Sequence, residues 1–142
     1  MKILKTTFLS AAVLLLSTAS WADTSRTASK EGASVYIISP ADGETVSKNF
    51  TVKFGLQGMG VAPAGTEKAG TGHHHLLIDG KALPPMDKPM GKDGIKHFGG
   101  GQTEAMLSLD PGKHSLQLVL GDKSHVPHDP PLVSQKITIM VK

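Results

Sequence analysis

Short runs of apolar residues, separated by glycine and proline turns, limit what this chain can fold into more than any other feature. Six such runs fit the two-residue period of β-strands, and no stretch shows the period of an amphipathic helix. The runs are Val35–Ile38, Phe50–Leu56, His73–Asp79, Ala105–Leu109, Leu116–Leu120 and Ile137–Val141. Regularly spaced strands of this kind predict an all-β fold, an immunoglobulin-like antiparallel β-sandwich of about seven short strands.

The first 22 residues have the pattern of a cleavable signal peptide. Lysines precede an apolar run from Phe8 to Leu16, and small residues at Ser20 and Ala22 fit a cleavage site. The run is too short to cross a bilayer, which takes about 20 residues. We therefore expect residues 1–22 to be removed, and the periplasmic product to have no membrane span. The remainder divides into a flexible leader (23–33) and one domain (34–142).

The composition argues against several classes of function. The sequence contains no cysteine, so the protein can form no disulfide and cannot use a cysteine as a nucleophile. Its formal charge of +3 falls by two once Lys2 and Lys5 are removed, and no basic run suggests nucleic acid or a membrane surface as a partner. No serine lies on a nucleophile elbow. A binding protein is therefore favoured over an enzyme.

Three consecutive histidines open the third predicted strand, and the whole sequence contains seven. Residues i and i+2 of a strand share a face, so His73 and His75 point the same way as Leu77, whereas His74 faces the other side. Two histidines in this spacing are a recurring half-site for zinc or copper. The alternative is a strand start with exposed or capped imidazoles.

A second group of polar residues runs from His97 to Glu104 through a glycine-rich turn. Glu104 is a candidate metal ligand, or an acceptor that orients an imidazole. The alternative is a glycine hairpin whose polar residues bind loop backbone. The residues with an expected structural role are Gly99, Gly100, Gly101 and Gln102.

A third group, His125 and His128, flanks a proline-stiffened turn that can place both imidazoles on one side of a loop. The alternative is a solvated loop in which prolines end a strand. Met86 and Met90 precede His97 in a long loop, and their soft sulfur atoms could ligate Cu(I). Methionine in such a loop can equally be a packing residue.

The stretch from Leu109 to Leu118 resembles the corner between the fifth and sixth strands of immunoglobulin-like domains. A tyrosine usually stands where this chain has His114, and its hydroxyl binds the corner backbone. The resemblance implies a structural role for His114, with a similar bond to the backbone.

Four motifs together resemble an uncharacterised family of small exported bacterial domains, a domain of unknown function (the 4399 family). They are Gly72–Asp79, His97–Glu104, Pro111–His114 and His125–His128. The resemblance extends from about Val35 to Val141. It implies an exported single domain without a known activity. More loosely, the chain resembles periplasmic copper-binding β-sandwich proteins, which implies copper held by histidine and methionine.

The first hypothesis is a non-catalytic, exported, histidine-rich protein that binds copper or zinc. Its candidate ligands are His73, His75, His97, His125, His128 and Glu104. A single site requires their ligand atoms to lie within about 8 Å, since metal–nitrogen bonds are near 2 Å. The second hypothesis is a periplasmic interaction module that binds a protein, peptide or cell-wall glycan without metal. A third is a metal-assisted hydrolase, which needs an open coordination position in a pocket.

Overall fold

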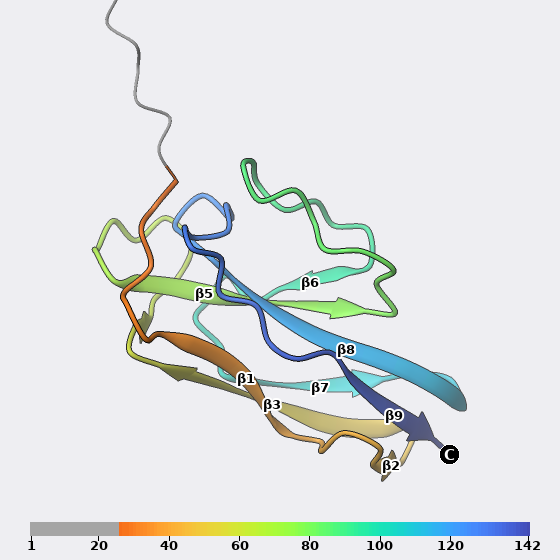
Figure 1. Cartoon of the computed structure of the whole chain (residues 1–142). Helices are drawn as coiled ribbons and strands as arrows, with labels where there is room; N and C mark the ends of the chain where they lie inside the picture. Colours follow the sequence, from red (N-terminus) through yellow and green to blue (C-terminus); the bar gives the residue numbers. More distant parts are fainter. Residues whose placement is uncertain (1–25) are drawn as a thin grey trace, which may run out of the picture.

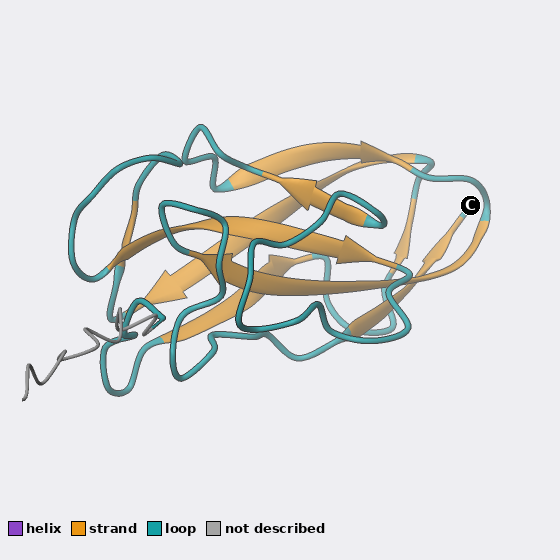
Figure 2. Cartoon of the chain, turned by 90° about the horizontal axis from the view of Figure 1, so that it is seen from above, coloured by secondary structure: helices purple, strands orange, loops and turns teal. Residues whose placement is uncertain are grey.

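The computed structural model describes residues 26–142, so the predicted signal peptide lies outside the described residues. The described part consists of strands and loops, and contains no helix (Figure 2). In chain order the strands are β1 (Ser34–Ser39), β2 (Thr45–Val46), β3 (Asn49–Gln57), β4 (Gly60–Val61), β5 (Thr71–Ile78), β6 (Ile95–His97), β7 (Glu104–Ser108), β8 (Gly112–Gly121) and β9 (Ile137–Val141). The all-β prediction is confirmed. Accordingly, residues 26–142 offer no helix that could cross a membrane.

The strands form two sheets that face each other (Figure 1). One sheet has the order β1-β3-β7, and the other has the order β2-β9-β8-β5-β4, with β6 paired to β5 as well. Most pairs are antiparallel, as expected, but β2 pairs with β9 and β4 with β5 in parallel. All six apolar runs form strands. The strands that the sequence did not reveal, β2, β4 and β6, are too short to show a period.

The main core lies between the sheets and is built from the inward residues of each strand. Strand β8 contributes Leu116, Leu118 and Leu120, none of which is measurably exposed. From the opposite sheet, β3 supplies residues such as Val52 and Phe54. Alternation of inward and outward side chains therefore fixes the register of β5 and β8, because a slip by one residue would move leucines out of the core.

Strand β5 is buried on both faces, and this positions the histidines. Its inward face joins the main core, and its outward residue Leu77 packs in a smaller apolar cluster with Val119 of β8 and Met90. Met90 comes from the long loop between β5 and β6, which extends above these strands in Figure 1. The outer face of the six-stranded sheet is therefore covered by loops where β5 and β8 meet.

Residues 26–29 belong to the segment whose polar composition predicts a flexible leader, but they are attached to the domain. The backbone N–H of Ser29 donates to Asp129 at 2.9 Å, and the N–H of Asp129 donates to Thr27 at 2.9 Å. This pairing lays the segment along the loop that follows β8.

Candidate metal centre

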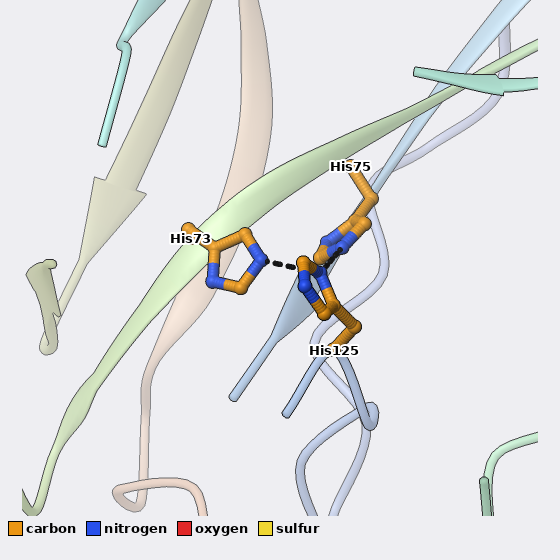
Figure 3. Close-up of side chains that lie close together, drawn as sticks. All are labelled: His73, His75 and His125. Carbon is orange, nitrogen blue, oxygen red and sulfur yellow. Dashed lines mark hydrogen bonds between the residues drawn. The ribbon is translucent and has the colours of Figure 1, made fainter. Parts of the chain in front are cut away.

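Three histidines from two distant parts of the chain meet on the outer face of the six-stranded sheet (Figure 3). His73 and His75 project from β5, and His125 reaches them from the loop after β8. One ring nitrogen from each lies within 4.8 Å of the other two. The spacing required for a single site is therefore met by these three residues, which could hold a metal ion.

The rings of His73, His75 and His97 all approach one atom, Nδ1 of His125. It lies 2.9 Å from Nε2 of His73 and 3.1 Å from Nε2 of His75. Nδ1 of His97, at the end of β6, approaches the same atom at 3.3 Å. His97 thus adjoins the group of three as a possible fourth ligand.

Hydrogen bonding cannot satisfy these contacts together. A neutral imidazole nitrogen has either one proton to donate or one lone pair with which to accept. Nδ1 of His125 can therefore form one ordinary hydrogen bond, yet three nitrogens lie within 3.3 Å of it. Four nitrogens bound to one ion at about 2.0–2.1 Å would lie roughly 3.3 Å apart in tetrahedral geometry. The distances of 2.9, 3.1 and 3.3 Å from Nδ1 of His125 are close to this value, and His73, His75 and His125 form the group whose ligand atoms all lie within 4.8 Å of one another.

Each of His73, His75 and His97 has a second ring nitrogen that does not approach His125, and its surroundings in His97 differ from those in the other two. Nε2 of His97 lies 2.9 Å from the Gly91 carbonyl, so its N–H donates there and Nδ1 is left with a free lone pair toward the cluster. The Nδ1 atoms of His73 and His75 are buried without a hydrogen-bond partner. The His97 imidazole therefore has a backbone acceptor that fixes its tautomer.

Burial favours the uncharged forms of His73, His75 and His125. Desolvation, followed by repulsion from the neighbouring histidines, lowers the pKa of His73 to about 4 and that of His75 to about 2. The pKa of His125 is lowered mainly by desolvation as well. Their lone pairs are therefore available to a cation without prior loss of a proton.

Two predicted ligands lie away from this cluster. His128 is fully buried, but its ring nitrogens face backbone carbonyls, with Nε2 3.2 Å from Thr71. Glu104 is exposed in β7, paired with Lys53 of the three-stranded sheet. The structure therefore does not bring His128 or Glu104 to the other candidates, because one imidazole is turned to backbone and the carboxylate lies on another sheet.

Met86 and Met90, the two methionines of the loop between β5 and β6, differ in burial and contacts. Met90 is buried and packs with Leu77 and Val119 on the outer face, beside the cluster. Its backbone N–H donates to the His125 carbonyl at 3.0 Å, which ties the two loops together. Met86 is half-buried in the same loop. These contacts give Met90 a packing role, and ligation of copper by either methionine stays a prediction.

The residues with an expected structural role make local bonds. Nε2 of His114 lies 2.9 Å from the Asp110 carbonyl, which is the backbone contact expected at the corner. Its Nδ1 also lies 2.8 Å from Asp79, a partner that the sequence did not suggest. In the glycine turn, the N–H of Gly100 donates to the Gln102 side chain at 3.0 Å. Gly101 has a φ of 81°, and Gly99 precedes them in the same turn.

Comparison with known proteins gives one match. A family model described as "Domain of unknown function (DUF4399)" matches residues 52–142. This range contains β5, β6 and β8, and with them the four histidines that gather on the outer face. No significant match was found among curated proteins or among solved structures. The looser resemblance to periplasmic copper-binding sandwiches stays a prediction.

Proposed function

The chain belongs to the DUF4399 family, and we propose that it binds one copper or zinc ion as a non-catalytic, periplasmic protein. The ligands are Nε2 of His73, Nε2 of His75 and Nδ1 of His125, with Nδ1 of His97 as the fourth. The observation that carries the proposal is the approach of three imidazole nitrogens, at 2.9, 3.1 and 3.3 Å, to a His125 nitrogen that can form one hydrogen bond.

The donor set narrows the choice of ion. Neutral imidazoles suit zinc, copper, nickel and ferrous iron, whereas magnesium and calcium take oxygen ligands. A set of three or four imidazole nitrogens suits Zn(II) or Cu(I), which accept tetrahedral geometry, whereas Cu(II) favours a square-planar arrangement. An exported protein meets these ions outside the cytoplasm, and the lack of cysteine leaves histidine as its strongest available ligand.

An interaction module is the second candidate, because the outer face of the three-stranded sheet exposes large apolar side chains. Tyr36 and Ile38 of β1 are 45% and 57% exposed, and Met106 of β7 is 76% exposed. A periplasmic protein partner could cover them. The hydrolase alternative has less support, since two well-formed surface cavities among the described residues, of about 220 and 230 Å³, are lined by residues other than the cluster histidines.

Isothermal titration of the metal-free protein with Zn(II), Cu(II) and, under reductant, Cu(I) tests the proposal. We expect one ion per chain, bound far more tightly than about 100 μM, which corresponds to roughly 5.5 kcal/mol. His125→Ala and the double variant His73→Ala/His75→Ala should abolish tight binding. Glu104→Gln is the matched control, because Glu104 is exposed on the other sheet. Absence of tight binding by the unmodified protein would overturn the proposal and favour the interaction module.

A further inference from the structure

The ligand His125 occupies a backbone conformation that its loop must enforce. Its φ is 65°, in the left-handed region, which few residues other than glycine adopt without cost. Its N–H donates to the Asp122 carbonyl at 2.9 Å, and the N–H of Asp122 donates to the Val126 carbonyl at 2.8 Å. Residues 122–126 therefore form a closed turn with His125 near its end.

The side chain of Asp122 holds this turn from inside. Its Oδ1 accepts the N–H of Ser124 at 2.8 Å and the N–H of Val126 at 2.9 Å. Asp122 is 7% exposed, so these bonds are shielded from water. The Asp122 carboxylate therefore closes the turn through two shielded hydrogen bonds.

Its second oxygen is bound by a residue from the far end of the chain. The Thr27 hydroxyl donates to Oδ2 of Asp122 at 2.6 Å. Thr27 is itself fixed, because its carbonyl accepts the N–H of Asp129, and the neighbouring Arg26 donates to the carbonyls of Pro127 and His128. Arg26 also forms an ion pair with Asp129 at 3.4 Å. The segment before β1 thus braces the loop that holds His125.

We infer that Thr27 and Asp122 are positioning residues for the metal ligand His125, so that Arg26 and Thr27 support the metal centre without belonging to it. The inference rests on the proposed function. A ligand on a loop loses binding free energy if the loop must be ordered when the ion arrives, and a preformed turn avoids that loss. The negative charge of the Asp122 carboxylate would also partly balance the positive charge that an ion brings to the uncharged imidazoles.

Thr27→Val is the sharpest test, because it removes the hydroxyl donor and keeps the size and branching of the side chain. We expect the dissociation constant for Zn(II) or Cu(II), measured by titration, to rise by about tenfold or more, as for other partners that orient metal ligands. Thr27→Ser keeps the donor and should restore nearly all of the affinity. The matched control is Ser29→Ala, whose hydroxyl donates to Pro130 outside the turn.

A second readout separates positioning from general stability. Thermal unfolding of the metal-free variants reports stability, and electron paramagnetic resonance of the Cu(II) forms reports the nitrogen ligands. The inference predicts altered Cu(II) spectra for Thr27→Val and for Asp122→Asn, with Ser29→Ala unchanged. Unchanged affinity in Thr27→Val, with or without a lower melting temperature, would overturn the inference while the proposed function stands. Failure of the unmodified protein to bind any of the ions would overturn the proposed function itself.

Discussion

The imidazole of His75 lies over the backbone of Gly121 on the neighbouring strand. A Cβ atom at Gly121 would stand 2.4 Å from Cε1 and 2.9 Å from Nδ1 of His75, closer than unbonded atoms approach. It would also lie 2.9 Å from the terminal methyl group of Met90. The missing side chain at Gly121 therefore creates the space in which His75 turns toward the other histidines.

Gly121→Ala should consequently displace the His75 ring. We expect metal affinity to fall by at least about tenfold, since a ligand moved by an ångström no longer meets the ion. Overpacking should also lower the free energy of unfolding by roughly 1–3 kcal/mol. Titration and chemical denaturation measure the two effects. Gly60→Ala is the matched control because a Cβ there comes no nearer than 3.6 Å to another atom, and equal affinities for the two variants would contradict the prediction.

Acid should destabilise the metal-free protein through the same cluster. Burial lowers the pKa of His73 to about 4 and that of His75 to about 2, whereas both are near 6.5 in the unfolded chain. Below about pH 6.5 the unfolded state therefore binds more protons, and the free energy of unfolding falls with pH by up to about 1.4 kcal/mol per unit for each histidine.

Denaturation of the protein in chelator between about pH 7 and pH 4.5 measures this slope. His75→Gln removes one titrating group, so its curve should be shallower over the same range, whatever the variant does to overall stability. Identical slopes for the variant and the unmodified protein would contradict a buried, uncharged His75.

The face of β5 that holds the ligands could be predicted from sequence because strand geometry is local. Alternation alone separates His73 and His75 from His74, and the structure places them on opposite faces of the sheet. The His74 ring points inward and packs against Phe54 in the main core, with the two ring centroids 5.2 Å apart. A two-residue period gives orientation without any knowledge of the partner strand.

The sequence identified His125 as a candidate ligand but could not distinguish it from His128, because loop geometry depends on contacts far along the chain. Spacing made His125 and His128 equivalent candidates. The structure separates them, since the Asp122 turn directs one ring to the cluster while the other fills the space beside Gly72, whose Cβ would lie 2.8 Å from the His128 ring. An aspartate whose side chain can accept the backbone N–H two residues later, as Asp122 does, is a local sign of such a turn. Nothing local indicates that Thr27 completes it.

His97 should contribute less to affinity than His125. His97 is not one of the three residues whose ligand atoms all lie within 4.8 Å of one another, whereas Nδ1 of His125 lies within 3.3 Å of a nitrogen of each of the other three rings. We expect His97→Ala to weaken metal binding by about 10- to 100-fold and still to bind one ion per chain, and we expect His125→Ala to abolish binding. Titration under the same conditions gives the ranking. If His97→Ala lost binding entirely, four histidines rather than three would be the minimum site.

The pair of His114 and Asp79 should make stability depend on pH in a separate window. The bond to Asp79, with a further contact to the Asp110 carbonyl, raises the pKa of His114. Burial opposes ionisation of Asp79, yet the bonds from His114 and Ser115 hold its pKa below the ordinary value. The stability that comes from the raised pKa of His114 is present below about pH 6.5 and is lost as the pH rises through the pKa of His114 in the folded protein. The stability that comes from the lowered pKa of Asp79 is lost in strong acid.

Asp79→Asn isolates this effect, because asparagine tolerates the positive φ of 56° at this position and can still accept the Ser115 N–H at 2.8 Å. The partly exposed pair should contribute up to about 1 kcal/mol while both groups are charged. We therefore expect the variant to differ most from the unmodified protein near about pH 5.5 and least near about pH 9 in chemical denaturation, where His114 is neutral. Since both residues lie far along the sheet from the metal ligands, metal affinity at neutral pH should be the same in the two proteins. A difference in stability that stays constant across this range would show that packing at the corner, and not charge, is the contribution of the pair.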